Sequence, residues 1–158
     1  MSRPPFPSRK RTRLDPGAYA VIGAICSVTI GVRDRSQVFA DVRAAATAVE
    51  VLRAYADTTS VLVYGYCVMP DHVHLVLGPS CRCDVIAFVG GFKGLVQRAA
   101  WQLGLRGRLW QTGFYDHFLR AEELVERVVE YVLDNPVRAG VVGSRREYAF
   151  SGSLVYEL

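Results

Sequence analysis

Two histidines separated by one residue are the strongest sign of chemistry in this chain. His72 and His74 flank Val73 and precede the apolar residues 75–77, a composition typical of a buried β-strand. Because side chains alternate faces along a strand, both imidazoles project from one face while Val73 projects from the other. Two imidazoles on one rigid face can bind a metal ion together. The same spacing also fits a pair of partly exposed strand histidines without a ligand, so this motif alone does not assign a function.

A phenol and a carboxamide lie one helical turn apart further along the chain. Tyr131 and Asn135 belong to a predicted helix over residues 121–135, which ends where a proline follows. Leu124 and Val128 continue the same spacing, which predicts a largely inward face that includes Tyr131 and Asn135. A buried tyrosine with a satisfied hydroxyl, and an asparagine that ends a helix, are the ordinary explanations. Combined with the histidines, however, they supply two nitrogens and one amide oxygen for a cation, and one hydroxyl nucleophile.

The elements that must position these residues form a small α+β domain. We expect a flexible basic arm over residues 1–17 and a single domain over residues 18–158. Hydrophobic periodicity and turn residues predict strands at 19–32, 61–68, 72–77 and 114–120, and helices at 36–56 and 84–103, capped by Ser36 and Asp84. With the helix that carries Tyr131, this order is the ferredoxin-like β-α-β-β-α-β arrangement with an antiparallel sheet and a C-terminal helix.

Composition restricts the class of protein. The chain has 158 residues, and its 51% hydrophobic and 22% charged content is an ordinary balance for a globular domain. There are 19 Lys and Arg against 15 Asp and Glu, and arginine dominates the basic residues. Arginine-rich positive charge suits bidentate contacts with phosphates, but a genome biased toward arginine codons gives the same composition. We expect no membrane span, and four cysteines without a C-x-x-C pair fit reduced thiols in a cytoplasmic, nucleoid-associated protein.

Three blocks of the sequence resemble the HUH single-tyrosine transposases. They are residues 66–77, which contain His-Val-His, residues 110–120, and residues 131–142, in which Asn-Pro follows four residues after the tyrosine. The last block continues with Arg-Ala-Gly and is similar in particular to the REP-associated tyrosine transposases. Members that mobilise ordinary insertion sequences tend to end this helix with Gln instead. The resemblance covers roughly residues 19–142.

This resemblance implies a metal-dependent reaction on single-stranded DNA. His72 and His74 would bind a divalent cation, either Mg²⁺ or Mn²⁺, with the side-chain oxygen of Asn135 as the third protein ligand. Tyr131 would attack the scissile phosphate to give a 5′-phosphotyrosine and a free 3′-hydroxyl, and the reverse step would join strands. Family members recognise a hairpin with a short neighbouring tetranucleotide. The expected partner is therefore a DNA hairpin, bound by a monomer or a homodimer.

Several basic and aromatic side chains are candidates for contacts with DNA. We expect phosphate contacts from Lys93, Arg98, Arg106 and Arg108, and base stacking on Trp110 or Tyr115. Each of these residues also fits a solvated surface or a core position. For His117, a structural or supporting hydrogen bond is expected rather than metal ligation.

Two other classes of protein remain open. A protein with the same fold could hold DNA or RNA hairpins without cutting them, although the intact set of four site residues argues against this. A small zinc module would use Cys67, His72, His74 and either Cys81 or Cys83. Structural zinc prefers more closely paired cysteines, which makes this second alternative the weaker one.

Overall fold

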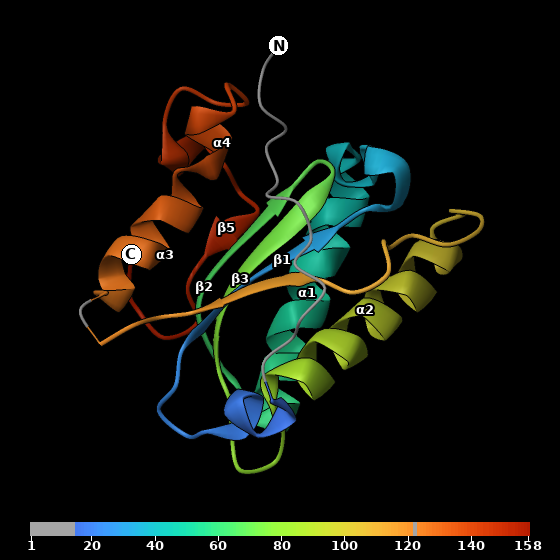
Figure 1. Ribbon diagram of the computed structural model, residues 1–158. Coiled ribbons are helices and arrows are strands. Elements are labelled where there is room, and N and C mark those ends of the chain that lie inside the picture. The colour runs from blue at the N-terminus through green and yellow to red at the C-terminus, as the bar shows by residue number, and fades with distance from the viewer. Residues whose placement is uncertain (1–14, 122) are drawn as a thin grey trace.

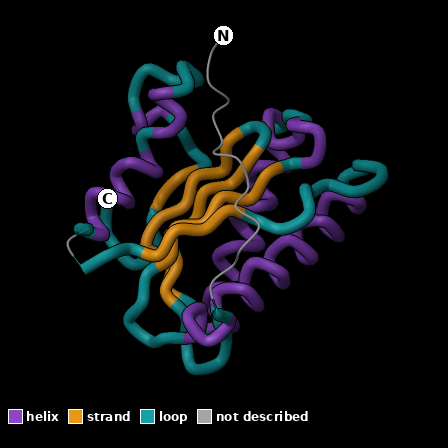
Figure 2. The backbone as a smooth tube through the Cα atoms, in the orientation of Figure 1, coloured by secondary structure: helices purple, strands orange, loops and turns teal. Residues whose placement is uncertain are grey.

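A single antiparallel sheet organises the computed structural model, which describes residues 15–121 and 123–158. Its strands lie in the order β4-β1-β3-β2-β5. Their bounds are β1 (Cys26–Gly31), β2 (Leu62–Met69), β3 (His72–Gly78), β4 (Tyr115–Phe118) and β5 (Ser151–Gly152). Helices α1 (Val42–Thr59) and α2 (Val85–Gln102) lie together behind one face of this sheet (Figures 1 and 2).

The connectivity confirms the predicted fold class. The chain runs β1-α1-β2-β3-α2-β4, and β3 pairs antiparallel with both β1 and β2. This is the expected ferredoxin-like order. Strand β5 was not predicted: it is only two residues long and pairs with the edge of β2, where Cys67 opposes Ser151. None of the helices in the described part of the chain combines the length and hydropathy that crossing a membrane requires.

The first predicted strand and the first predicted helix both begin later than expected. Residues Pro16–Ala20 form a short 3-10 helix, with Asp15 as its cap and Tyr19 fully buried, before β1 begins at Cys26. Asp41 caps α1 through the backbone N–H of Arg43 at 2.8 Å, so the predicted cap at Ser36 is wrong. Two 3-10 turns, Arg33–Arg35 and Val38–Ala40, connect β1 to α1, and the backbone is left-handed at Asp34 and Arg35 just before Ser36.

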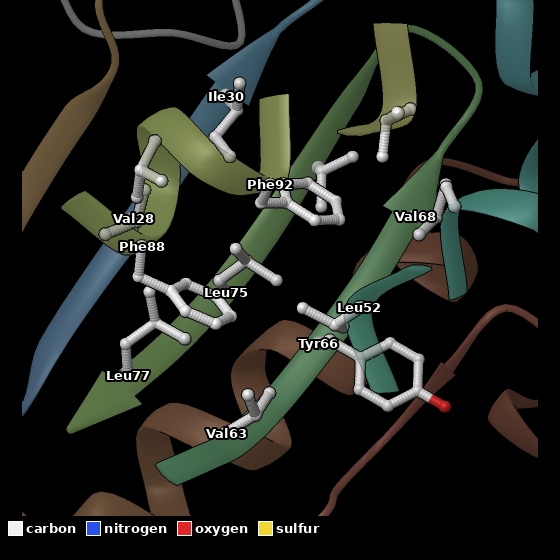
Figure 3. Packing of buried hydrophobic residues seen from close by; sticks show 14 of the residues in the cluster. Val28, Ile30, Leu52, Val63, Tyr66, Val68, Leu75, Leu77, Phe88 and Phe92 are labelled. Carbon is white, nitrogen blue, oxygen red and sulfur yellow. The ribbon is translucent and has the colours of Figure 1, made fainter. Parts of the chain in front are cut away.

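The predicted hairpin and second helix are confirmed. Asp84 caps α2 by accepting a hydrogen bond from the backbone N–H of Ala87 at 2.7 Å. The main core lies between the sheet and these two helices, where alternate residues of β1 and β3 meet the aromatic side of α2 (Figure 3). Among its fully buried members are Val28, Ile30, Leu75, Leu77, Phe88 and Phe92. The intervening residues of these strands consequently face the other side of the sheet.

The third helix packs on that other side, but with a different face from the one predicted. Helix α3 (Val125–Leu133) buries Val129, Val132 and Leu133 against β2 and β3. These positions form a continuous apolar stripe, and Tyr131 lies on the opposite side of the helix with 63% of its surface exposed. The prediction that Tyr131 faces inward is therefore wrong. The proline after Asn135 does not end the helical structure. It lies in the first turn of a further short helix, α4 (Asn135–Arg138).

Helix α3 approaches the sheet closely at a glycine. A Cβ added to Gly65 of β2 would lie 3.1 Å from a methyl carbon of Val129. The pairing of β2 with β3 also shifts register between Val63 and Gly65, which marks a local irregularity at this point. The missing side chain therefore sets how near the tyrosine-bearing helix comes to the histidine strand.

Candidate active site

The two histidines lie on the face of β3 that packs against α3. Val73 and Leu75 belong to the core under α1 and α2, whereas Val76 belongs to the cluster formed with α3. Strict alternation along the strand places His72 and His74 on the same side as Val76. The sequence prediction that both imidazoles share one face is confirmed.

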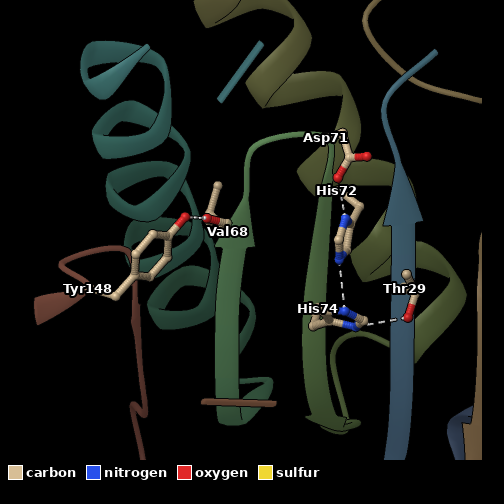
Figure 4. Close-up of polar contacts among 6 residues, drawn as sticks. All are labelled: Thr29, Val68, Asp71, His72, His74 and Tyr148. Atoms are coloured by element: carbon tan, nitrogen blue, oxygen red, sulfur yellow. Dashed lines mark hydrogen bonds and ion pairs between the residues drawn. The ribbon is translucent and has the colours of Figure 1, made fainter. Parts of the chain in front are cut away.

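Each imidazole is anchored through its Nδ1 atom. Nδ1 of His72 lies 2.5 Å from Oδ1 of Asp71, and Nδ1 of His74 lies 3.0 Å from Oγ1 of Thr29 on β1 (Figure 4). Strand register brings this threonine into place, because Thr29 is the direct partner of His74 in the β1–β3 ladder. A carboxylate or hydroxyl behind a histidine fixes the orientation of the ring and leaves the opposite nitrogen for a ligand.

The Nε2 atoms of the two rings converge. Nε2 of His72 and Nε2 of His74 are 3.0 Å apart, and the ring planes are inclined by 89°. Two nitrogens bound about 2.1 Å from one ion, at roughly 90° to each other, would be separated by about 3.0 Å. The spacing therefore fits two neighbouring ligands of an octahedral cation. The residues present fit a divalent metal ion in the position that the sequence predicts.

Burial keeps both imidazoles neutral. Burial, together with electrostatic interactions with His72 and Arg138, lowers the pKa of His74 to about 3. Burial also lowers the pKa of His72, although Asp71 opposes that shift. A neutral imidazole is the form that binds a metal. Both histidines are therefore ready to bind a cation at neutral pH without first losing a proton.

Tyr131 and Asn135 are joined by an arginine that had no role in the sequence prediction. The guanidinium carbon of Arg138 lies 3.6 Å from the centre of the Tyr131 ring, in a cation–π contact. Its two terminal nitrogens donate to the backbone oxygen of Tyr131 at 2.7 Å and to Oδ1 of Asn135 at 2.6 Å. One side chain thus holds the predicted nucleophile and the predicted third ligand together.

The tyrosine pair and the histidine pair are neighbours, but they are not in direct contact. Within residues 15–121 and 123–158, no hydrogen bond joins Tyr131 or Asn135 to either histidine. Nδ2 of Asn135 is buried without a hydrogen-bond partner, an arrangement that costs free energy. The effect of Arg138 on the pKa of His74 shows that this cation lies near the imidazoles.

The zinc alternative is wrong for the part of the chain that the structure describes. That part contains no group of three His, Cys, Asp or Glu side chains arranged to hold a metal ion. Cys81 and Cys83 follow the far end of β3, several residues beyond His74. Burial raises the pKa of the Cys67 thiol to about 12, which disfavours the thiolate that zinc requires.

Two of the residues predicted to contact DNA, Lys93 and Trp110, make hydrogen bonds within the protein. Trp110 is only 4% exposed, its ring packs near Phe39 and Phe92, and its indole N–H donates to the backbone oxygen of Lys93. This packing leaves little of the indole surface accessible, so stacking of a base on Trp110 stays a prediction. The ammonium of Lys93 donates to the backbone oxygens of Gln111 and of Gly113, at 2.8 and 3.0 Å, so it holds the loop before β4.

The other predicted contacts remain accessible. Arg98, Arg106 and Arg108 are exposed, and Tyr115 is half-buried on β4 opposite Thr29, on the side of the sheet that carries the histidines. Arg108 donates to the hydroxyl of Thr112 at 2.7 Å. His117 lies 3.0 Å from a carboxylate oxygen of Glu123, which confirms the expected supporting hydrogen bond.

Three site residues were missed for different reasons. Asp71 was treated as a turn residue, although a carboxylate directly before a candidate ligand is a recognisable signal. Arg138 lies three residues after Asn135, the spacing of helix neighbours, but this pairing needs the short helix after Pro136. Thr29 could not be found, because only the register between β1 and β3 brings it to His74.

Comparisons with known proteins agree with this geometry. Residues 21–135 match the family model "Transposase IS200 like". No curated protein matches the chain. A solved structure of the REP-associated tyrosine transposase bound to a REP hairpin is similar with a TM-score of 0.72 and 21% identity, over 90% of this chain and 82% of that chain. A protein from Deinococcus radiodurans R1, described as a transposase, is similar with a TM-score of 0.54 and 22% identity, over 78% and 95%.

Proposed function

The chain belongs to the IS200-like transposase family, and on this premise we propose that it cleaves and rejoins single-stranded DNA through a covalent bond to Tyr131. The observation that carries the proposal is the convergence of the two Nε2 atoms of His72 and His74, 3.0 Å apart. Both rings are anchored from behind and both are neutral. A pair of this kind is suited to bind a divalent cation beside a nucleophile.

In this proposal, His72 and His74 hold Mg²⁺ or Mn²⁺, with Oδ1 of Asn135 as the third protein ligand. When bound, the cation neutralises charge on the scissile phosphate and polarises it. A carbonyl oxygen has two lone pairs, so Oδ1 of Asn135 can accept from Arg138 and still face a cation. Nδ2 of the same amide is buried without a hydrogen-bond partner, and a rotation of the amide toward the metal site would give it access to one.

Tyr131 is the proposed nucleophile. Its phenolic oxygen would form a bond to phosphorus while the bond from phosphorus to the 3′-oxygen breaks, which leaves a 5′-phosphotyrosine and a free 3′-hydroxyl. The exposed position of the ring lets the phenolic proton pass to water. Arg138 holds the ring face and restricts the directions from which the oxygen can attack. Attack by a 3′-hydroxyl on the phosphotyrosine reverses the step and joins strands.

We propose a DNA hairpin as the substrate. A similar solved protein is described as bound to a REP hairpin, and the exposed arginines of this chain supply the positive charge that a folded strand needs. The alternative is a protein that binds such hairpins without cutting them. The position of Tyr131, exposed and without a hydrogen bond to the histidine pair in the described residues, is also consistent with this alternative.

A cleavage assay separates these two functions. The protein is incubated with a hairpin oligonucleotide that carries single-stranded flanks and a 3′-end label, with and without Mn²⁺, and run on a denaturing gel. The proposal expects a labelled protein–DNA adduct that needs the metal and disappears in Tyr131→Phe, while Tyr115→Phe retains it. Hairpin binding without any adduct would instead establish the non-catalytic function.

A further inference from the structure

A cavity of about 380 Å³ lies between the end of β1 and the loop that leads into β4. Its wall includes Gly31, the direct strand partner of His72. Paired residues in an antiparallel ladder lie about 5 Å apart, which is less than the length of one nucleotide. A base next to a phosphate held at the histidines would therefore lie within reach of this cavity.

The side-chain amide of Gln111 lies over Gly31 in the wall of the cavity. Ile30 belongs to the core under α1 and α2, so Gly31 faces the opposite side, where His72 lies. A Cβ added to Gly31 would lie 2.7 Å from Oε1 of Gln111, which shows that the amide occupies the space of the missing side chain. Within residues 15–121 and 123–158, the hydrogen bonds of Gln111 involve its backbone atoms, with Lys93 and Gly31 as partners, and the donors and acceptor of its side-chain amide remain available.

The wall that carries Gln111 is rigid. Lys93 donates to the backbone oxygens of Gln111 and Gly113, and the buried Trp110 donates to the backbone of Lys93. The backbone N–H of Gln111 also donates to the oxygen of Gly31 at 2.9 Å. These contacts fix the glutamine relative to the histidine strand before any ligand arrives, which lowers the cost of binding.

The remaining lining residues indicate what kind of ligand fits. Phe114 and Tyr115 contribute aromatic surface, and Arg33 and Arg108 place positive charge at the cavity. Asp34, on the same wall, has a left-handed backbone with φ of 56° although it is not a glycine. Such conformations cost free energy and cluster at ligand-binding positions. A flat heterocycle with hydrogen-bonding groups, attached to a phosphate, matches aromatic walls, a free amide and two cations.

We propose that this cavity binds one unstacked nucleobase next to the scissile phosphate, and that the Gln111 amide reads its hydrogen-bonding edge. This inference rests on the proposed function and adds a sequence-reading position to it. A side-chain amide both donates and accepts, so it can distinguish bases by the pattern on their edges. Lys93 and Trp110 support this role by holding the backbone of the loop that carries Gln111.

Selection from a random library tests the proposal. Hairpins flanked on both sides by four randomised single-stranded nucleotides are bound to Tyr131→Phe protein, which should bind DNA without cutting it, and the retained sequences are read. We expect one flank position to favour a particular base by roughly tenfold. In Gln111→Ala, made in the same background, this preference should disappear while the hairpin is still retained. Gln102→Ala, at the exposed end of α2, should keep it.

A second variant keeps the test independent of the glutamine itself. Gly31→Ala leaves Gln111 in the chain but displaces its amide, and it should remove the same preference. A preference that survives in both variants, or hairpin retention with no preferred base at any flank position, would overturn the base-reading cavity and leave the proposed function intact. Failure of the parent protein to retain any hairpin would contradict the proposed function, and this inference with it.

Discussion

Each imidazole of the histidine pair is oriented by a neighbour whose role depends on a single atom. Asp71 holds Nδ1 of His72, and Thr29 holds Nδ1 of His74. The carboxylate keeps the proton of His72 on Nδ1 and leaves Nε2 with a bare lone pair. For His74, the hydroxyl can donate or accept, so its tautomer can follow whether a cation or the other imidazole lies in front of it.

We expect Asp71→Asn to weaken Mn²⁺ binding by roughly 10- to 100-fold, because the ring loses its charged partner but keeps its neighbours in place. His72→Ala should abolish measurable binding. Calorimetric titration of the metal-free protein with Mn²⁺ checks both variants. Asp57→Asn, an exposed carboxylate on α1, is the control and should bind as the wild type does. Unchanged affinity in Asp71→Asn would remove the orienting role of this carboxylate.

The buried histidines should also make the metal-free protein sensitive to mild acid. The pKa of His74 falls from its ordinary value of 6.5 to about 3 on folding, so the unfolded chain takes up a proton that the folded chain refuses. The free energy of unfolding should therefore be fully retained above pH 6.5 and decrease as the pH falls toward 3. Urea unfolding at pH 7 and pH 5 should show a smaller decrease in His74→Gln. An equal decrease in both proteins would contradict the neutral buried state.

Arg138 joins the nucleophile to the third ligand, and this contact predicts a catalytic defect. Arg138→Ala should slow adduct formation by about 100-fold, because the Tyr131 ring loses its cation–π contact and the attack geometry is lost. Arg138→Lys should not restore the rate, since an ammonium cannot form both hydrogen bonds and cover the ring. The rate of adduct formation is measured for each variant in a quenched time course, with Arg127→Ala, at an exposed position, as the control. Wild-type rates in Arg138→Ala would show that the contacts of Arg138 with Tyr131 and Asn135 do not contribute to the reaction.

Among the elements, α3 determines where the nucleophile lies, and its position depends on Gly65. A methyl group there would press on Val129 at 3.1 Å, so Gly65→Ala should lower the free energy of unfolding by about 1–3 kcal/mol and slow cleavage. Gly90→Ala is the matched control. It adds the same methyl group to open space on α2, and it should raise stability by roughly 1 kcal/mol. Thermal unfolding and the adduct assay measure both effects, and a neutral Gly65→Ala would show that α3 tolerates displacement.

The helices and strands also show which parts of the fold can be predicted from the sequence. The apolar composition of β2 and β3, the tight turn between them and the Asp84 cap allowed the hairpin and α2 to be predicted nearly to the residue. The face of α3 was misread because Leu124, Val128 and Tyr131 have helical spacing too. The competing stripe that includes Val129 and Val132 is the one that the sheet buries. Local periodicity identifies a helix, but only packing decides which of two apolar stripes faces inward.

At the scale of the whole molecule, the sheet separates stability from chemistry. The face under α1 and α2 is apolar, and the opposite face carries His72, His74 and Tyr115 in neighbouring strands. The order of strands and helices was sufficient to predict this architecture. The cavity beside Gly31 was not predictable, because it depends on Lys93 and Gln111 meeting across 18 positions of sequence. Contacts between residues so far apart in the sequence form only in the folded protein.

The most direct test of the account is to locate the covalent bond. The adduct formed with hairpin DNA and Mn²⁺ is digested with nuclease and trypsin, and the modified peptide is identified by mass spectrometry. Cleavage after Arg127 and Arg138 releases residues 128–138, in which Tyr131 is the only tyrosine. The account predicts a nucleotide phosphate on this peptide. A phosphate on residues 109–120, which contain Tyr115, or retained hairpin without any modified tyrosine, would contradict it.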